Sequence, residues 1–500
     1  MSKENSTEPL APLEHVLAEA FLSSGELVLL APIRRAEMLR SIASDLEMCS
    51  SELVEIAVRE TGLTAGRLTG EVARTVNQCR FYADVIEDGR YLGITVTPAV
   101  AGAKPPVQDH RRINQPLGPV LVFASSNFPF AFGVLGTDTA SALAAGCAVV
   151  AKSHPGHPEL GRRLHAIASH ALLTAGIQHS PIGLIEGRGD SLAALEDSRI
   201  QAGAFTGSIA GGTALMALAQ RRSKPIPFFA EMGSVNPVVV TEAAWLARRD
   251  EIISGFIASM SINNGQLCTS PGLLFTPADV SLAQLVERAT DNFVEAPLLT
   301  DSIAHDFRTT IKERTGTEQS IVPLSPVRVA NGRSAHPIIW RTSTRDLKLY
   351  PELLDETFGP SAIIVEYADI ADIIPVLESM DGQLTGSVFA EPFEDAGILI
   401  SSMSQLAGRV VMNSWPTGVA VSWSMHHGGP WPASSTSGPG SVGAEAIGRF
   451  LRPITFQNFA DDALPIPLQD ANPWRVPRAI DGEFESVISS AVMGRDRGPT

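Results

Sequence analysis

The sequence is poor in cysteine, in positive charge and in long apolar runs. It has four cysteines and no C-x-x-C pair, so the pattern indicates neither a zinc site nor a disulfide framework and fits a reducing compartment. The net charge of −16 argues against a role in binding nucleic acid phosphates. No apolar run is long and uncharged enough to cross a bilayer, and the first residues do not have the pattern of a signal peptide. We therefore expect a soluble, cytoplasmic protein without a nucleic acid or membrane partner.

The composition is that of a folded chain with more than one core. Hydrophobic residues make up 44% and charged residues 18% of the sequence. A chain of 500 residues exceeds one ordinary core, so we expect two or three domains. Apolar periodicity predicts helices up to about Gly89, with clear stretches at 10–22 and 36–58. Residues 96–112 are rich in Pro, Ala and Gly and predict an extended connector or a hairpin.

From Pro119 onward, short β-rich runs alternate with helical stretches. We expect strands at 120–124, 148–151, 182–186, 202–206 and 226–230, and helices at 136–145, 159–175 and 211–220. This alternation predicts an α/β fold with right-handed βαβ units and a mainly parallel sheet, as in dinucleotide-binding domains. Because no G-x-G-x-x-G follows the first strand, a cofactor cannot be inferred from that fingerprint.

A second α/β region extends from Gly233 to about Met425. Its candidate strands are 237–240, 272–276, 361–366 and 386–390. A stretch rich in Gly, Ser and Pro, at 428–443, follows it. The C-terminal tail is predicted to be irregular.

Cys268 lies after a helical run at 252–260 and before Pro271-Gly272. A thiol at such a junction would be partly exposed and close to backbone N–H groups, which favour the thiolate. The alternative is a buried structural thiol, which is the commoner fate of a free cysteine.

Glu231 and Asn127 each follow an apolar strand. Burial would raise the pKa of the Glu231 carboxyl and suit it to general-base work; a capping or ion-paired carboxylate is the alternative. Asn127 lies at the sheet edge where α/β proteins bind ligands, and its amide could donate to an oxyanion. An ordinary turn asparagine is the alternative.

Three further groups have weaker signals. Lys152 ends the second strand, where it could reach a ribose or phosphate. Thr206-Gly-Ser opens a helix, where N–H groups suit a pyrophosphate, although Gly-Ser also makes an ordinary cap. His154, His157 and the pair His426-His427 lack carboxylate partners at metal-site spacing, so we expect no metal site.

Four motifs occur in a fixed order: Ser126-Asn-Phe-Pro, Glu231-Met-Gly-Ser, Gly265-Gln-Leu-Cys-Thr and Glu356-Thr-Phe-Gly-Pro. Because of these four motifs and their order, the sequence resembles the aldehyde dehydrogenase superfamily over nearly its whole length. It is most similar to the branch of α-ketoglutaric semialdehyde (2,5-dioxopentanoate) dehydrogenases and related NADP-using fatty aldehyde dehydrogenases. That similarity lies in the segments that begin at Thr61, Asp138, Lys152, His427 and Arg449.

The resemblance implies an aldehyde dehydrogenase fold with a Rossmann-like cofactor domain, an α/β catalytic domain and a small bridging β-hairpin. The cofactor domain would comprise residues 1–97 and 118–232, with a return segment at about 431–450, and the catalytic domain residues 233–430. Residues 98–117 and 451–500 would form the hairpin, a strand and the tail. In this family the hairpin pairs with a C-terminal strand, here near 454–457, which implies a homodimer or homotetramer.

The resemblance also implies the reaction, which is the NAD(P)-dependent oxidation of an aldehyde to its carboxylic acid. Cys268 would be the nucleophile. Asn127 and the Cys268 backbone N–H would form the oxyanion hole, and Glu231 would activate the water that hydrolyses the thioester. These roles agree with general chemistry, because a thiohemiacetal can lose a hydride and the resulting thioester needs an activated water.

The cofactor residues follow from the same resemblance. Lys152 would bind the adenosine ribose or its 2′-phosphate, and Thr206, Gly207 and Ser208 the pyrophosphate. Glu356 would hold the nicotinamide ribose, with Phe358 beside the ring, and Ser153, Pro155 and Gly233 would complete the site. Pro155 stands where many NAD-preferring relatives carry a glutamate that clamps the ribose hydroxyls. We therefore expect NADP, or both NADP and NAD, as cofactor.

The substrate pocket would contain Phe128, Phe132, Thr269 and Trp431. In the semialdehyde branch an arginine-containing run precedes Ser-Val-Gly, whereas this chain has Ser435-Thr-Ser-Gly-Pro-Gly at that place. One carboxylate partner is thus missing. Both 2,5-dioxopentanoate and a medium-chain, long-chain or aromatic aldehyde are candidate substrates.

Two other functions compete with this prediction. In a CoA-acylating dehydrogenase, CoA would take the acyl group in place of water, but such an enzyme does not need Glu231. In a binding protein without catalysis, we would expect one of the core positions to be lost, and all are present.

Overall fold

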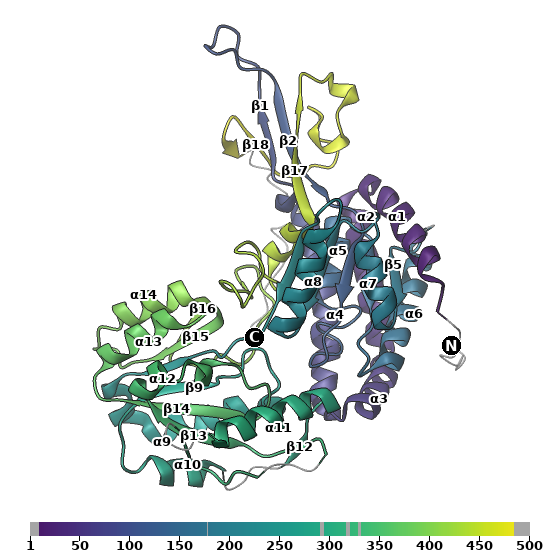
Figure 1. The fold of residues 1–500 in the computed structure, drawn as a ribbon. Coiled ribbons are helices and arrows are strands. Elements are labelled where there is room, and N and C mark those ends of the chain that lie inside the picture. The colour runs from purple at the N-terminus through teal and green to yellow at the C-terminus, as the bar shows by residue number, and fades with distance from the viewer. Residues whose placement is uncertain (1–9, 178, 291–294, 317–320, 329–331, 485–500) are drawn as a thin grey trace, which may run out of the picture.

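The computed structural model describes residues 10–177, 179–290, 295–316, 321–328 and 332–484. Three large sheets organise these residues: two helix-covered sheets and a third that projects beyond the first (Figure 1). Two ends of the chain lie outside the described part: residues 1–8, which the expectation about a signal peptide concerns, and residues 485–500 of the C-terminal tail. Among the described helices, none has the length and apolarity needed to cross a membrane.

The N-terminal residues form four helices, as the periodicity predicts: α1 (Leu13–Leu29), α2 (Pro32–Met48), α3 (Ser50–Thr61) and α4 (Ala65–Asp88). The single stretch expected at 36–58 is divided at Cys49, whose ψ of 6° breaks the helical geometry between α2 and α3. Helix α3 ends at Gly62, which adopts a left-handed φ of 72°, a conformation that glycine reaches without strain. The Thr64 side chain then caps α4 by accepting a hydrogen bond from the Arg67 N–H, as N-cap residues do.

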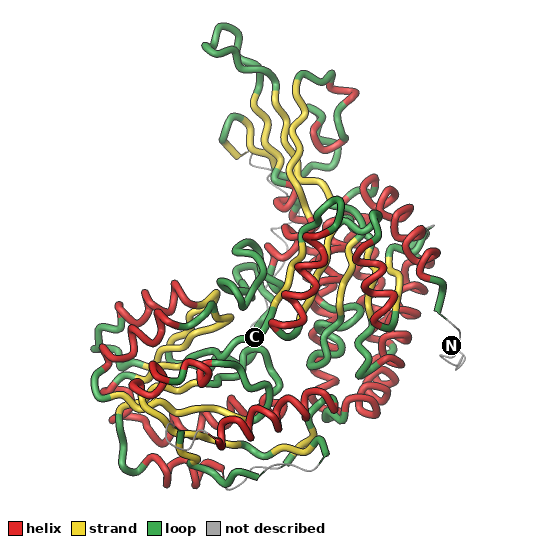
Figure 2. The backbone as a smooth tube through the Cα atoms, in the orientation of Figure 1, coloured by secondary structure: helices red, strands yellow, loops and turns green. Residues whose placement is uncertain are grey.

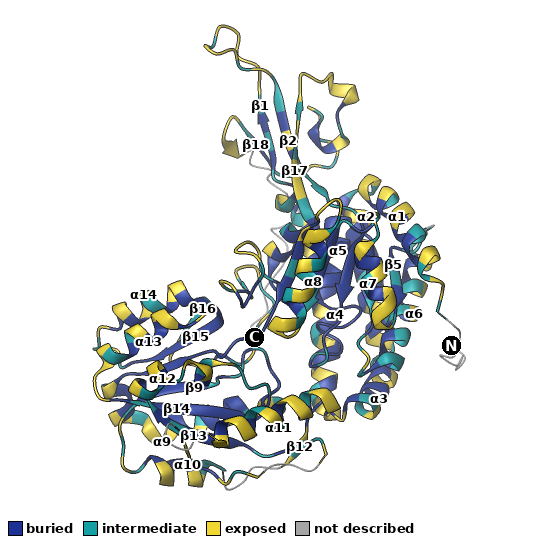
Figure 3. Cartoon of the chain, viewed as in Figure 1, coloured by how far each residue is buried: buried dark blue, intermediate teal, exposed yellow. Residues whose placement is uncertain are grey.

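The first sheet has five parallel strands in the order β5-β4-β3-β6-β7. They are β3 (Val120–Phe123), β4 (Val149–Lys152), β5 (Ile182–Ile185), β6 (Ala202–Thr206) and β7 (Phe228–Glu231). Helices α5 (Thr137–Ala145), α6 (Pro158–Thr174), α7 (Arg188–Glu196) and α8 (Ile209–Arg221) connect them. Most strand residues are buried (Figure 3), which explains their continuous apolar runs.

Two details of this sheet differ from the expectation. Strand β7 begins at Phe228 and not at Ile226, because Pro225 and Pro227 have no N–H to donate. Helix α7 was not foreseen.

The carboxyl ends of neighbouring strands align at one edge of this sheet, because Phe123 pairs with Lys152, and Thr206 with Glu231. The strand order reverses at β3, which is where open α/β sheets bind ligands.

The second sheet has seven strands in the order β11-β13-β14-β9-β8-β15-β16, and all but β11 are parallel to their neighbours. The strands are β8 (Val238–Val240), β9 (Leu273–Pro277), β11 (Val322–Pro323), β13 (Ile338–Ser343), β14 (Ser361–Tyr367), β15 (Gln383–Phe389) and β16 (Ala407–Met412). Its helices are α9 (Glu242–Ser261), α10 (Leu282–Thr290), α11 (Asp301–Gly316), α12 (Thr344–Leu349), α13 (Ile373–Ser379) and α14 (Gly397–Leu406). A separate pair, β10 (Ala296–Pro297) and β12 (Ser334–Ala335), lies nearby.

The third sheet has the order β17-β2-β1-β18-β19. It contains β1 (Ile94–Thr97), β2 (His110–Pro116), β17 (Leu451–Gln457), β18 (Arg478–Ile480) and β19 (Glu483–Phe484). Strands β1 and β2 are antiparallel, so the expected connector is a hairpin, and β17 pairs with β2 through Ile454 and Ile113.

Short 3-10 helices complete the description: η1 (Arg90–Leu92), η2 (Ile262–Gly265), η3 (Pro351–Leu354), η4 (Ile370–Asp372), η5 (Ala444–Phe450), η6 (Asp461–Ala463) and η7 (Ile466–Leu468). The tube in Figure 2 shows a long loop region between β16 and β17 that runs between the two helix-covered sheets. That region carries residues of the site described next.

Candidate active site

A cavity of about 310 Å³ lies between the two α/β units and brings most of the predicted site together. The predicted residues that line it are Asn127, Thr206, Gly207, Ser208, Glu231, Gly233, Cys268, Glu356 and Phe358. They come from the carboxyl ends of β3, β6 and β7 and from loops of the second sheet. Residues of α11, among them Phe307, close the opposite wall.

Cys268 is fixed by the backbone around it. After α9, Asn263 and Asn264 have left-handed φ values of 59° and 54° and turn the chain into η2. The Asn236 amide then donates to the Cys268 carbonyl (2.8 Å) and to the Ser270 carbonyl (2.9 Å). The thiol is therefore held on a tight loop and not on a regular element.

The Cys268 thiol does not have the environment that the sequence predicted. Burial raises its pKa well above the ordinary value, and the charges of Glu231 and Glu356 raise it further; Arg74 and the Cys268 backbone N–H oppose them only in part. The expectation that the environment favours the thiolate was thus wrong. Burial and the two carboxylates in the same cavity favour the neutral thiol. The sulfur needs a base to take its proton.

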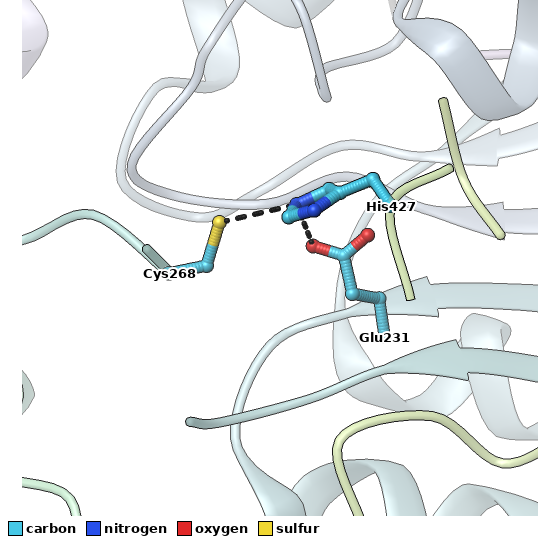
Figure 4. Close-up of side chains that lie close together, drawn as sticks. All are labelled: Glu231, Cys268 and His427. Atoms are coloured by element: carbon cyan, nitrogen blue, oxygen red, sulfur yellow. Dashed lines mark hydrogen bonds and ion pairs between the residues drawn. The ribbon is translucent and has the colours of Figure 1, made fainter. Parts of the chain in front are cut away.

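His427 supplies a nitrogen at the required place. Its Nε2 lies 3.5 Å from the Cys268 sulfur and 3.0 Å from a Glu231 oxygen (Figure 4). The imidazole is 1% exposed, and the backbone carbonyl of His427 accepts a hydrogen bond from the Ser441 N–H (2.8 Å). Nε2 is the ring nitrogen that faces both groups, so it donates a proton to Glu231 when protonated and can accept the thiol proton when it is not.

In the sequence, His427 was considered only as a metal ligand and was set aside for want of a carboxylate partner. Folding supplies one from Glu231, which is almost two hundred positions away in the chain. The ligand atoms of Glu231, Cys268 and His427 lie within 4.8 Å of one another, so the reason for setting the histidine aside was wrong.

Glu231 ends β7 and is buried. Burial raises its pKa, but the charge of His427 and hydrogen bonds from His427 and Ser441 outweigh that effect, so its pKa is lowered. The Ser441 hydroxyl donates to Oε2. The predicted raised pKa was therefore wrong, since the sequence did not show these two partners, and the carboxylate is ionised at neutral pH.

Asn127 lies in the loop after β3 and lines the same cavity as Cys268. Its amide nitrogen donates to the Gln266 carbonyl (3.1 Å), which leaves a second N–H of that amide for another acceptor. Arg67 donates to the Asn127 carbonyl (2.6 Å). The loop is thus tied to α4 and to the cysteine loop.

Six of the predicted cofactor residues line the cavity: Thr206, Gly207, Ser208, Gly233, Glu356 and Phe358. Burial raises the pKa of Glu356 to about 7, and this carboxyl lies so close to Gly233 that a Cβ there would meet Oε2. The Thr206 hydroxyl is buried and has no hydrogen-bond partner among the described residues. A buried acceptor and an unpaired hydroxyl beside the N-terminus of α8 suit a ribose and a pyrophosphate. These residues therefore fit a dinucleotide.

Lys152, Ser153 and Pro155 lie beyond the cavity wall, at the end of β4 beside β3. Burial lowers the pKa of Lys152, and the Ser153 hydroxyl is buried without a hydrogen-bond partner among the described residues.

The predicted substrate residues separate into two places. The Phe128 and Phe132 rings are 5.6 Å apart and belong to an apolar cluster with Val419, Val421 and Met425. Thr269 is buried beside Cys268. Trp431 is 51% exposed and, through its backbone carbonyl, accepts a hydrogen bond from Gly382 (2.9 Å); it does not belong to that cluster.

Comparison with known proteins shows the family directly. The sequence profile described as "Aldehyde dehydrogenase family" matches residues 13–453. The chain belongs to the aldehyde dehydrogenase family. It is an oxidoreductase, and the family uses NAD(P)+.

Two relatives of this aldehyde dehydrogenase have similar lengths. It is 39% identical over 468 residues to "Alpha-ketoglutaric semialdehyde dehydrogenase 2" of Azospirillum brasilense, covering 90% of this chain and 87% of that one. It is 38% identical over 459 residues to "Alpha-ketoglutaric semialdehyde dehydrogenase" of Acinetobacter baylyi, with the same coverage of 90% and 87%. The predicted resemblance is confirmed.

Solved structures confirm the predicted fold. Aldehyde dehydrogenase 21 of Physcomitrella patens matches with a TM-score of 0.75 at 18% identity, covering 91% of this chain and 92% of that one. A 1-pyrroline-5-carboxylate dehydrogenase from Thermus with bound NAD matches with a TM-score of 0.75 at 20% identity, covering 89% and 85%.

Proposed function

We propose that the enzyme oxidises an aldehyde to its carboxylic acid through a thiohemiacetal and a thioester on Cys268. The observation that carries this proposal is a row of three side chains: His427 Nε2 lies 3.5 Å from the Cys268 sulfur and 3.0 Å from a Glu231 oxygen. Cys268 and Glu231 both line the cavity. A nucleophile, a base and a carboxylate that orients the base are the parts of covalent catalysis.

In the first step, His427 Nε2 takes the thiol proton and the sulfur attacks the aldehyde carbon. A carbon–sulfur bond forms, and the carbonyl π electrons move to oxygen. The free N–H of the Asn127 amide and the Cys268 backbone N–H stabilise that oxyanion. Removing one such donor typically lowers kcat by about 10²–10³-fold.

The cavity border at Thr206, Gly207, Ser208, Gly233 and Glu356 would hold NADP or NAD. When bound, the nicotinamide supplies the hydride acceptor of this oxidation. Ser153, Lys152 and Pro155 extend the border towards the adenosine end, and Phe358 would lie beside the nicotinamide ring.

In the last step, the ionised Glu231 takes a proton from water as the water attacks the thioester. The carbon–sulfur bond breaks, and the proton held by His427 returns to the sulfur. This role of Glu231 favours hydrolysis over transfer of the acyl group to CoA, which would need no such base.

The cofactor preference is proposed from Lys152 and Pro155. No carboxylate stands at position 155 to repel a 2′-phosphate, and Lys152 offers a positive charge near that place. We expect a ratio of kcat/KM for NADP over NAD of at least about one, with each tenfold preference equal to about 1.4 kcal/mol. A strong preference for NAD would contradict this part of the proposal.

The proposed substrate is 2,5-dioxopentanoate, because the two relatives above are named for α-ketoglutaric semialdehyde. Medium-chain, long-chain and aromatic aldehydes remain the second candidates, since Phe128 and Phe132 line an apolar cluster. We also propose a homodimer or homotetramer, assembled through the sheet that contains β2 and β17; light scattering on the full chain would measure its mass.

The deciding experiment is the formation of NADPH or NADH with a panel of aldehydes, for the unchanged enzyme and for Cys268→Ala. The unchanged enzyme should be active and Cys268→Ala inactive. Cys49→Ala, which removes a half-buried thiol outside the cavity, is the matched control and should keep its activity. Full activity of Cys268→Ala would refute the covalent mechanism.

A further inference from the structure

Helix α4 carries two arginines whose guanidinium groups are mostly buried beside the active site. Arg67 and Arg74 are seven residues apart and therefore share one face of the helix. Arg67 Nη1 and Arg74 Nη2 are both shielded from solvent, and neither has a hydrogen-bond partner among the described residues. A buried, unpaired donor of a charged group is costly, so these two nitrogens indicate a ligand.

Both arginines contact the aromatic residues that follow Asn127. The Arg67 guanidinium carbon is 5.1 Å from the centre of the Phe128 ring, and that of Arg74 is 5.7 Å from the same ring. Arg74 also lies 5.8 Å from the Phe132 ring. The two positive charges therefore border the apolar cluster of Phe128, Phe132, Val419, Val421 and Met425.

Arg74 is also close enough to act on the sulfur. Its charge lowers the pKa of the Cys268 thiol against the larger effects of burial and of Glu231 and Glu356. Arg67 holds the backbone of Asn127, the proposed oxyanion donor, through its 2.6 Å hydrogen bond. Arg74 is thus a charged neighbour of the sulfur, and Arg67 is bound to the loop that carries Asn127 into the cavity.

The charges around the pair do not balance. Glu71 is the acidic residue between the two arginines, and its Oε1 already accepts hydrogen bonds from the Phe130 N–H (2.9 Å) and the Ala131 N–H (3.0 Å). Its Oε2 lies 3.5 Å from Arg67, and burial raises the pKa of this carboxyl. One carboxylate faces two guanidinium groups, so at least one positive charge is left over.

Other acidic groups near the cluster have their own partners. Glu231 acts on Arg74 electrostatically but is bound by His427 and Ser441. Asp138 forms a buried ion pair with Arg449 at 2.7 Å. The Nε of Arg74 donates to the neutral Gln78 side chain (3.1 Å). The excess positive charge therefore remains with the Arg67–Arg74 pair.

We propose that Arg67 and Arg74 form a carboxylate-binding subsite that selects short aldehydes with a carboxylate at the end opposite the reacting carbon. The proposal rests on the aldehyde oxidation at Cys268 proposed above and adds the residues that choose the substrate. Guanidinium groups bind carboxylates through charge-assisted hydrogen bonds, which are among the strongest in proteins. The pair would thus replace the arginine that is absent from residues 435–441.

The test compares two substrates with the same aldehyde and chain, 5-oxopentanoate and its methyl ester, methyl 5-oxopentanoate, in which a methyl group replaces the negative charge. For the unchanged enzyme we expect kcat/KM for the acid to exceed that for the ester by at least about tenfold. In Arg74→Gln, both values should fall because the thiol loses a nearby positive charge, but the value for the acid should fall at least about tenfold more than that for the ester. Arg74→Lys, which keeps the charge, should recover part of the loss.

Arg80→Gln is the matched control, because Arg80 lies on the same helix in an exposed ion pair with Glu47. It should change neither value. Glutarate, used as an inhibitor competing with the methyl ester, gives a measure of binding that does not depend on turnover of the acid. Its inhibition constant should rise at least about tenfold in Arg74→Gln.

Equal kcat/KM values of the unchanged enzyme for acid and ester would overturn the subsite while leaving the dehydrogenase function intact. An equal fall for both substrates in Arg74→Gln would assign Arg74 a structural role and overturn it too. If Arg74→Gln does not fold, Arg74→Lys and the acid-to-ester ratio of the unchanged enzyme decide. If the unchanged enzyme oxidises neither of these two aldehydes and no other aldehyde of the panel, the proposed function itself is refuted.

Discussion

Replacing His427 by glutamine removes the imidazole nitrogen that lies 3.5 Å from the Cys268 sulfur. The thiol in the variant then has no side-chain base at that position, and burial, Glu231 and Glu356 keep its pKa well above the ordinary value. A thiol with a pKa of about 9 or more is at most about 1% ionised at pH 7. We therefore expect His427→Gln to react slowly at neutral pH.

The size of the effect follows from the distance. A thiolate and an imidazolium 3.5 Å apart attract each other by about 5 kcal/mol at an effective dielectric constant of about 20, which is an upper bound on the stabilisation lost. Positioned acid–base groups contribute about 10²–10⁴-fold. We expect kcat/KM to fall by about 10²–10³-fold, or about 3–4 kcal/mol of activation free energy.

Alkylation measures the thiolate without any need for catalysis. Iodoacetamide labelling of Cys268, followed by peptide mass from pH 6 to 10, should be about a hundredfold slower in His427→Gln at pH 7 and should recover as the pH rises, because only the thiolate reacts. Labelling of Cys49 in the same sample is the internal control. Ser441→Ala, which removes the other partner of Glu231, should leave the labelling of Cys268 nearly unchanged. Labelling of His427→Gln at the unchanged enzyme's rate at pH 7 would refute the reasoning.

Three further predictions concern other parts of the site and its support. Glu231→Gln should give a slower first burst of NADPH, because His427 loses the carboxylate that orients it, and then a steady rate about 10²–10⁴-fold lower than the burst, because the thioester forms but is not hydrolysed; equal burst and steady rates would contradict the hydrolytic role. Glu356 accepts hydrogen bonds from the ribose hydroxyls more strongly as a carboxylate than as an acid, so with its pKa at about 7 the dissociation constant of NADP should rise up to about tenfold per pH unit below pH 7. Fluorescence titration should show that slope in the unchanged enzyme and a flat, weaker response in Glu356→Gln; equal slopes would contradict the role. Asp138→Asn removes the negative charge that compensates the buried Arg449, and urea unfolding should report a loss of about 3–5 kcal/mol in the free energy of unfolding, whereas a loss below about 1 kcal/mol would show that the charge pair is not needed.

The strands and helices around the cavity were predictable because their signals are local. Buried parallel strands such as β3 and β4 have short apolar runs as their sequences, and the helices between them show the 3.6-residue period of apolar positions. Errors arose where a single residue type overrides the pattern: Pro227 delays β7, and Cys49 divides α2 from α3.

The ionisation of the site was not predictable in the same way. The expected pKa of Glu231 was too high and that of Cys268 too low, because each depends on charges that come from distant parts of the chain. His427 is separated from Cys268 by more than 150 positions, and no spacing rule connects them. A histidine next to Gly428-Gly429 looks, in sequence, like a loop residue.

The sequence by itself determined the family, the five strands of the first sheet and the motifs that contain Cys268, Glu231 and Asn127, because motifs and periodicity are properties of neighbouring residues. The tertiary structure alone decided that His427 lies between Glu231 and Cys268 and that Arg67 and Arg74 both face the Phe128 ring. Proton transfer and charge pairing act over a few ångströms. Only the folded chain brings residues from α4, β7 and the loop before η5 within that range.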